Sequence, residues 1–402
     1  MRIALIADAF PPMRTSGAIQ LMDLSQELLR QGHLLTVLIP SSDLDRPWLL
    51  EEVSGVQVLR LKALRTKDIG YVRRTINEFL MPFAMLRNLR KSPIARAQWE
   101  GVVWYSPTIF LGPIALALKK SSGCKSYLVL RDIFPEWAVN TGLMGRGLPY
   151  LFFKGIEKFQ YSVANVIGVQ TQANVAYLDS WAVSDGRQVQ VLQNWLSNSS
   201  DVGCSIVVAG GRLAGRTVFV YAGNMGVAQG MGVLLDLAES LRSRTDIGFL
   251  FVGRGSDTQR LSKDASQRGL DNVVFYDEIY PSYIPGLYAQ CHIGIVALDP
   301  RHKTHNIPGK FLSYMQAGLP VLASINPGND LEEMILREGL GRVCIDQSVG
   351  TLQRLALELV DEVSAARAAG GTAVIAERCK ALSAKMFSPK TAVNQIVEAL
   401  KK

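Results

Sequence analysis

Short apolar runs alternate with longer amphipathic stretches along this chain, and the alternation starts again in the second half. The apolar run Arg2–Ala7 is followed by a Pro/Gly loop, a helical pattern to about Gln31 and a second apolar run, Leu34–Ile39. This order predicts a β-α-β unit with a right-handed crossover. Further strands are expected at 57–61, 102–105, 126–130, 166–170 and 190–192, and then at 217–222, 248–252, 273–276, 293–296, 319–323 and 342–345.

The length of 402 residues suits two domains. Trp195–Arg216 is rich in Ser, Asn and Gly and is interpreted as a linker leading into the second half. We therefore expect an α/β protein with two Rossmann-like domains, 1–197 and 198–386, each with a mostly parallel sheet. The final segment, 387–402, is expected to be a helix that crosses back onto the first domain.

Composition narrows the class of protein. The hydrophobic fraction of 48% is that of a well-cored globular chain, and the five cysteines form no Cys-x-x-Cys pair, which favours a reducing compartment. The N-terminal residues show no signal-peptide pattern, and we expect a cytoplasmic protein. The longest apolar run, Val102–Leu118, is broken by proline and glycine and predicts a strand followed by a buried helix rather than a membrane span.

The net charge of +8 is concentrated in the first half, above all in 60–96. Basic residues there surround the apolar patch Phe79–Leu86, which is typical of a helix that docks on an anionic membrane surface. The alternative is a solvated basic face over an ordinary core helix. The charge is not accompanied by a nucleic-acid-binding motif, so nucleic acid is not an expected partner.

The segment 303–324 is interpreted as a loop, a helix Lys310–Gln316, a turn at Gly318 and a buried strand. Free N–H groups and the dipole of a helix start, with a lysine beside them, form a good anion site. Glycine loops at 223–226 and 253–256 also follow strands, and together they indicate a ligand crevice at the carboxyl ends of those strands. Each loop alone is equally compatible with an ordinary βα turn. The first strand lacks Gly-x-Gly-x-x-Gly, which argues against a dinucleotide dehydrogenase.

Six short motifs occur in a recognisable order: FPPMRTSGA near the start, RDIFPEWA at 131–138, QNW at 193–195, YAGNMG at 221–226, FVGRGS at 251–256 and IPGKFLSYMQAGLPV at 307–321. In this order they resemble a bacterial GT-B glycosyltransferase of the retaining family 4 type. The similarity is greatest to the branch that transfers amino-deoxy sugars such as N-acetylfucosamine during O-antigen and lipopolysaccharide assembly.

The resemblance implies two facing domains with a cleft, a UDP-sugar donor on the second and an acceptor on the first. It also implies retention at the anomeric carbon, no metal and no cofactor other than the UDP-sugar co-substrate. The expected acceptor is a polyprenyl-diphosphate-linked saccharide, which places the enzyme peripherally on the inner face of the cytoplasmic membrane. A nucleotide-sugar 2-epimerase and a non-catalytic UDP-binding scaffold of the same fold are the alternatives.

The resemblance also implies a set of donor-binding residues, in which the chain departs from the family. The family's paired glutamates are replaced by His305 and Ser313, and its Arg and Lys after the first strand of the second domain by Asn224 and Gln229. Lys310 is therefore the first candidate to stabilise the diphosphate. The full donor-binding set is Ser16, Gly17, Gly223, Asn224, Arg254, His305, Asn306, Ile307, Pro308, Gly309, Ser313 and Glu333, with Glu332 as an alternate for Glu333 at the ribose.

Asp132 ends a first-domain strand and is the candidate to orient or deprotonate the acceptor hydroxyl, with Glu136 as the alternate. An Asp that caps the following turn is the structural alternative. The Asp43/Asp45 pair and the His302/His305 pair lack further ligands in the sequence, so no metal site is expected.

Overall fold

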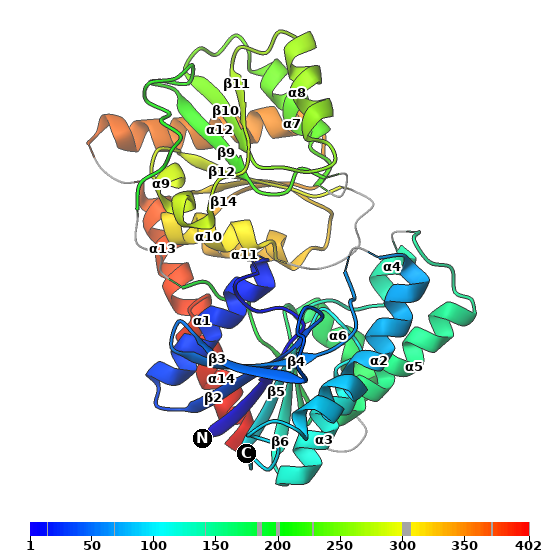
Figure 1. The fold of residues 1–402 in the computed structure, drawn as a ribbon. Helices are drawn as coiled ribbons and strands as arrows, with labels where there is room; N and C mark the ends of the chain where they lie inside the picture. The colour runs from blue at the N-terminus through cyan, green and yellow to red at the C-terminus, as the bar shows by residue number, and fades with distance from the viewer. Residues whose placement is uncertain are drawn as a thin grey trace. The chain divides into compact units, whose positions relative to one another are not determined.

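The computed structural model divides into two compact units, which are shown in Figure 1. Unit 1 comprises Met1–Trp195 and Pro389–Lys402, and unit 2 comprises Leu196–Ser388. The residues that the structure describes are 1–13, 15–67, 69–140, 142–182 (without the side chains of 179–182), 187–197, 202–226, 229–299, 307–370 and 373–401.

Among the described residues, unit 1 contains an eight-stranded sheet with the order β3-β4-β2-β1-β5-β6-β7-β8, parallel except for β3. The strands are β1 Arg2–Ile6, β2 Leu34–Ser41, β3 Trp48–Val53, β4 Val56–Lys62, β5 Gly101–Ser106, β6 Lys125–Leu130, β7 Val166–Val169 and β8 Gln188–Val191. The helices are α1 Ser16–Arg30, α2 Tyr71–Leu89, α3 Gly112–Ser122, α4 Glu136–Asn140, α5 Leu148–Val163, α6 Gln172–Ala182 and α14 Pro389–Lys401.

The sequence analysis missed one strand, β3. Its six residues include Glu51 and Glu52, so no apolar run marks it. It pairs antiparallel with β4 across a two-residue turn, Ser54-Gly55, in which both residues have positive φ (51° and 82°). Such turns match the twist of a hairpin and allow a short edge strand.

The sheet of unit 2 has the order β11-β10-β9-β12-β13-β14 and is parallel throughout the described residues. Its strands are β9 Thr217–Ala222, β10 Ile247–Val252, β11 Val273–Tyr276, β12 Ile293–Ala297, β13 Val321–Ser324 and β14 Gly341–Cys344. Its helices are α7 Gly232–Ser240, α8 Thr258–Gln267, the 3-10 turn η2 Pro281–Tyr283, α9 Ile284–Tyr288, α10 Gly309–Ala317, α11 Asp330–Glu338, α12 Val349–Ala368 and α13 Val374–Met386. The expected α/β class with two parallel-sheet units is confirmed.

Both sheets are covered on both faces, as the continuous apolar strands require. In unit 1, α2 and α3 pack on one face and α1 and α14 on the other. In unit 2, α10 and α11 cover one face, and α7, α8 and α12 the other. The strand order reverses between β1 and β5 in unit 1 and between β9 and β12 in unit 2. In open α/β sheets, ligands bind at the carboxyl ends of the strands at such a switch point.

The last helix, α14, is part of unit 1 and packs beside α1. Its apolar residues Val393, Ile396 and Leu400 are almost fully buried. Leu400 lies so close to Gly101 that any side chain at position 101 would collide with it. The chain thus returns from unit 2 to complete the core of unit 1.

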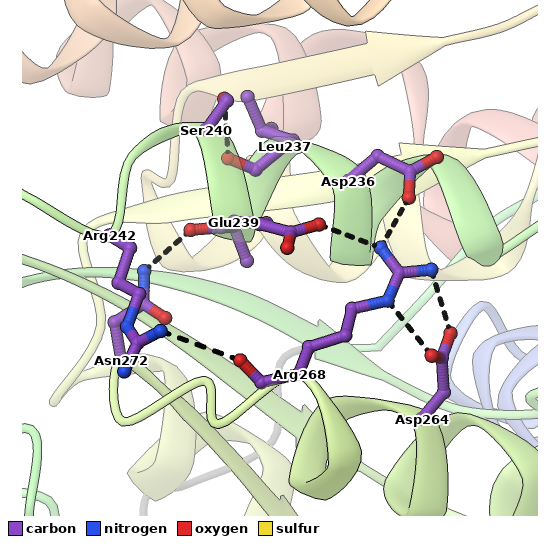
Figure 2. Close-up of polar contacts among 9 residues, drawn as sticks. Asp236, Leu237, Glu239, Ser240, Arg242, Asp264, Arg268 and Asn272 are labelled. Carbon is purple, nitrogen blue, oxygen red and sulfur yellow. Dashed lines mark hydrogen bonds and ion pairs between the residues drawn. The ribbon is translucent and has the colours of Figure 1, made fainter.

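Figure 2 shows the polar network that fastens α8 to α7 in unit 2. The guanidinium of Arg268 binds Asp264 through two hydrogen bonds of 2.8 and 2.9 Å, Asp236 at 2.6 Å and Glu239 at 3.1 Å. These hydrogen bonds raise the pKa of Arg268. Because every charge in this surface network is paired with another side chain, we interpret it as structural.

Within the described part of the chain, no helix combines the length and the apolar character needed to cross a bilayer.

Candidate functional site

Lys310 lies at the switch point of unit 2, in the first turn of α10. Its Nζ donates a hydrogen bond of 2.5 Å to the hydroxyl of Tyr221 in β9 and lies 3.7 Å from the centroid of that ring. Its Cε is 3.5 Å from the position that a Cβ of Gly223 would occupy. The fold therefore brings Lys310 to the end of β9, although Lys310 and Gly223 are 87 positions apart in the sequence.

Among the described residues, no acidic side chain acts on the charge of Lys310. Burial lowers the pKa of its amine to about 7, and no described carboxylate offsets this effect. A bound anion would raise the pKa of a buried amine in this position, because the anion stabilises the ammonium form that burial disfavours. The start of α10 adds to this tendency, since no side chain caps it and Pro308 occupies its N-cap position.

Tyr221 connects Lys310 to the first glycine loop. Its hydroxyl accepts from Lys310 and donates to the backbone oxygen of Asn224, at 2.6 Å. Asn224 donates to the side-chain oxygen of Gln229 at 3.3 Å, and the same oxygen accepts from the backbone of Gly226 at 3.0 Å. Lysine, phenol and loop thus form one hydrogen-bonded chain at the end of β9.

The two glycine loops pack directly against each other. Met225 donates its backbone N–H to the carbonyl of Arg254 at 2.8 Å. Gly253 has φ +143°, and a Cβ there would overlap the carbonyl of Gly223; a Cβ on Gly255 would overlap the backbone of Met225. The glycines are therefore required by the contact between the loops, apart from any contact with a ligand.

The other predicted donor-binding residues differ in their surroundings. Arg254 is exposed and pairs with Glu278 at 3.0 Å. Glu333 is exposed on α11 and pairs with Arg337 at 3.0 Å. The side chain of Ile307 is buried in the core, so only its backbone is available to a ligand.

Ser313 lies one turn after Gly309 on α10, with its hydroxyl 3.5 Å from the carbonyl oxygen of Gly309. His305 and Asn306 lie outside the described residues. In unit 1, Ser16 and Gly17 form the start of α1, where Thr15 caps the helix by accepting from the N–H of Ala18.

In unit 1, Asp132 lies two residues after the end of β6. Burial raises the pKa of its carboxyl, an effect that the adjacent Arg131 opposes and Asp8 reinforces. Asp8 follows β1 on the other side of the switch point, and its buried Oδ1 has no hydrogen-bond partner among the described residues. Burial likewise raises the pKa of Asp8. Two carboxyl groups thus occur together at the edge where the sheet order reverses.

Arg131 holds this edge in place. Its guanidinium donates to the backbone oxygen of Leu192 at 2.8 Å and lies 5.0 Å from the ring centroid of Trp195. The motif RDIFPEWA therefore contains one structural arginine and one carboxyl at the switch point.

Glu136, the alternate for Asp132, belongs to a different cluster. Its carboxylate accepts from the hydroxyl of Tyr150 at 2.7 Å and from Lys154 at 3.0 Å. Burial opposes the charge, but these hydrogen bonds prevail and lower the pKa of Glu136. A carboxylate held in this way is a weaker base than Asp132, so the geometry favours Asp132 of the two.

The sequence analysis missed two residues of these sites. Tyr221 begins the motif YAGNMG, but it stands in an apolar strand, where its pattern is that of an ordinary core position. Asp8 could have been found, because an acid directly after the first strand lies at the edge where the ligand was expected. In the part of the chain that is described, no three His, Cys, Asp or Glu residues are grouped as metal ligands.

Comparison with known proteins shows a similarity to glycosyltransferases. Residues 216–361 match the family model described as glycosyl transferases group 1. WbjE of Pseudomonas aeruginosa, a probable glycosyltransferase, is 24% identical over 266 residues, 64% of this chain and of WbjE. WcaI of Escherichia coli K12, a putative colanic acid biosynthesis glycosyl transferase, is 26% identical over 227 residues, 50% of this chain and 52% of WcaI. The matches thus span between half and two thirds of these relatives.

Solved structures resemble the chain over its whole length. Sucrose-phosphate synthase from Thermosynechococcus elongatus aligns with a TM-score of 0.73 and 16% identity, covering 100% of this chain and 98% of the enzyme. HepE from Anabaena, solved in complex with UDP and glucose, aligns with a TM-score of 0.67 and 16% identity, covering 100% of this chain and 99% of HepE. WaaG, a glycosyltransferase involved in lipopolysaccharide biosynthesis, aligns with a TM-score of 0.66 and 15% identity, covering 98% of this chain and 99% of WaaG.

The strand orders and these alignments confirm the expected GT-B fold. Within its second unit, residues 216–361 are similar to the glycosyl transferases of group 1.

Proposed function

We propose that this protein is a glycosyltransferase that takes its sugar from a UDP-sugar bound at the β9/β12 switch point of unit 2. The observation that carries the proposal is Lys310, a buried amine without an anionic partner among the described residues, beside Gly223 at the end of β9. The family match covers this region, and HepE, a structural neighbour, was solved with UDP and glucose.

The chemistry asks for positive charge at this place. When the bond between sugar and diphosphate breaks, negative charge grows on the leaving phosphate, and fixed cations and N–H groups stabilise it. Lys310 would supply the cation, and the uncapped start of α10 the N–H groups. Tyr221 would hold the amine toward the glycine loop.

We further propose a retaining reaction without a metal ion or other cofactor. The donor would be an N-acetylated deoxy-amino sugar, which offers few hydroxyl groups and suits a loop in which His305 and Ser313 replace two carboxylates. Unit 1 would bind the acceptor, with Asp132 orienting or deprotonating its hydroxyl.

The acceptor would be a polyprenyl-diphosphate-linked saccharide of bacterial surface polysaccharide synthesis. The colanic acid and lipopolysaccharide roles named for WcaI and WaaG support this class of product. A lipid-linked acceptor lies at a membrane, so the protein would act peripherally on the inner face of the cytoplasmic membrane, held there by the basic and apolar segment 60–96.

A titration tests the donor site. We expect calorimetry to detect UDP binding by the wild type. Lys310→Ala should bind UDP about 100-fold more weakly or transfer sugar about 100-fold more slowly, which is the scale of one lost transition-state charge contact. Lys263→Ala, which removes an exposed lysine of α8, is the matched control and should behave as wild type. Equal UDP affinity and turnover in Lys310→Ala and the control would remove Lys310 from the site.

Product analysis tests the reaction itself. Incubation with UDP-linked acetamido sugars and a lipid-linked acceptor should give a longer lipid-linked saccharide and free UDP. A free epimerised nucleotide-sugar, or UDP binding with no turnover of any donor, would contradict the proposal.

A further inference from the structure

Helix α2 has two apolar faces, and only one of them is buried. Met81, Met85 and Leu89, spaced by four residues, pack into the core of unit 1. On the other side lie Val72, Ile76, Phe79 and Phe83, which are 76%, 54%, 42% and 49% exposed. Their spacing of four, three and four residues places them in one stripe along the helix.

Helix α5 repeats this arrangement far away in the sequence. Leu148, Leu151, Phe152 and Phe159 are 82%, 62%, 44% and 40% exposed, while Tyr161 and Val163 are buried. Leu148, Phe152 and Phe159 again follow the i, i+4, i+11 spacing of a single stripe. A second unpaired apolar stripe is unusual for a surface helix, whose outer face is normally polar.

The two stripes meet. The rings of Phe79 and Phe152 lie 6.1 Å apart, and those of Phe79 and Phe83 lie 5.9 Å apart. Figure 1 shows α2 and α5 running beside each other in unit 1. We call the exposed apolar residues of both helices the two-helix surface; they are Val72, Ile76, Phe79, Leu80, Phe83, Leu148, Leu151, Phe152 and Phe159.

Exposed positive charge borders this surface. The basic residues are Arg73, Arg87, Arg90 and Lys91 on and after α2, and Arg146 and Lys158 before and on α5. The nearby acids are compensated: Glu78 pairs with Arg74 at 2.9 Å, and Glu157 is 1% exposed in its side chain and pairs with Lys154 at 2.6 Å. The outward charge of both helices is therefore positive.

We propose that α2 and α5 together form one docking surface for an anionic lipid bilayer. The aromatic and aliphatic side chains enter the interfacial layer, and the bordering arginines and lysines contact the headgroups. A second copy of this chain is a poor occupant, because it would bring the same positive border against itself. This inference rests on the proposed function, because the lipid-linked acceptor is the reason for a membrane contact. It extends that contact from segment 60–96 to α5.

Vesicle sedimentation tests the contribution of α5. We compare the double variants Leu148→Ser/Phe152→Ser on α5 and Phe79→Ser/Phe83→Ser on α2 with the control Leu336→Ser/Val374→Ser, two positions that are 57% and 62% exposed in unit 2. With mixed phosphatidylglycerol–phosphatidylcholine vesicles, we expect each helix variant to bind at least about tenfold more weakly than wild type and the control to bind unchanged. Vesicles of phosphatidylcholine alone should bind the wild type weakly.

The outcomes separate the two proposals. An α5 variant that binds vesicles as the control does would overturn the two-helix surface and leave docking by α2 intact. The surface would instead belong to a contact with a second copy if three results came together. The wild type would self-associate in sedimentation velocity, both helix variants would lose this self-association, and the wild type would not bind vesicles. UDP titration of the same variants should match wild type; vesicle binding without any UDP binding would sink the proposed function and leave this surface standing.

Discussion

At the scale of single residues, Lys310 is the most informative side chain of the molecule. Most lysines are exposed and fully charged at neutral pH, but burial lowers the pKa of Lys310 to about 7. Its amine is thus close to half-charged in the free protein at neutral pH, in contact with a phenol and a glycine loop. A bound diphosphate would favour the ammonium form and raise this pKa.

This coupling predicts a pH dependence of UDP binding. Below pH about 7 the amine is already protonated and binding needs no proton, whereas above pH 7 it must take one up. The affinity should therefore fall between pH 7 and 9, by up to about tenfold per pH unit. The terminal phosphate of UDP does not produce this fall, since its second pKa is about 6.

Calorimetry in two buffers of different ionisation heat measures the proton directly. Near pH 8 we expect uptake approaching one proton for the wild type and none for Lys310→Met, which keeps the length of the side chain without its charge. A constant wild-type affinity from pH 7 to 9 would contradict a titrating Lys310 in the donor site.

At the scale of elements, the contact between the loops after β9 and β10 sets the shape of the candidate donor site. Position 253 requires glycine for two reasons. Its φ is +143°, and the carbonyl oxygen of Gly223 occupies the place where a Cβ would lie. The loop after β9 carries Asn224, which is bonded to Tyr221, so a displaced loop would also disturb Lys310.

We therefore predict that Gly253→Ala destabilises unit 2 by about 2 kcal/mol or more, because the new methyl group meets backbone that cannot move aside. The melting temperature should fall by roughly 4–8 °C for a unit of this size, and UDP binding should weaken. Gly350→Ala in α12 is the control, since nothing lies within 4 Å of a Cβ there. It should leave stability unchanged or raise it by up to about 1 kcal/mol. Equal melting of both variants would show that the loops separate easily.

At the scale of the whole molecule, the chain leaves unit 1 after Trp195, builds unit 2 and returns as α14. The buried residues of α14 lie in the same core as α1 and the strands β1 and β5. The stability of unit 1 therefore depends on residues that follow the whole of unit 2 in the chain.

Removal of 389–402 should consequently unfold unit 1 and spare unit 2. Burial of Val393, Ile396 and Leu400 contributes about 1.5–3 kcal/mol of free energy for each side chain. The sum for the three is comparable with the free energy of unfolding of a whole domain. Hydrogen exchange should show lost protection in β1, β5 and β6 and retained protection in β9–β14. The exposed substitution Glu398→Ala serves as the control. Full protection of unit 1 in the truncated protein would mean that α14 is dispensable.

Much of this protein can be predicted from the sequence by itself. The apolar runs predicted the strands of both sheets because a strand buried on both faces must be almost continuously apolar. The edge strand β3 was missed because it is short, half-polar and held by a tight turn. The predicted boundaries at 197 and 386 lie close to the observed division at 195 and 388. The roles of the site residues, from Ser16 to Glu333, remain predictions.

Other properties were decided only by the tertiary structure. The sequence marks Lys310 as a lysine at a helix start, but its lowered pKa arises from the burial that Tyr221 and the end of β9 impose. The sequence also shows apolar spacing in α2 and α5, yet a buried stripe and an exposed one have the same spacing. Only the packing of the helices leaves one stripe of each facing solvent, because burial depends on neighbours that are distant in the chain.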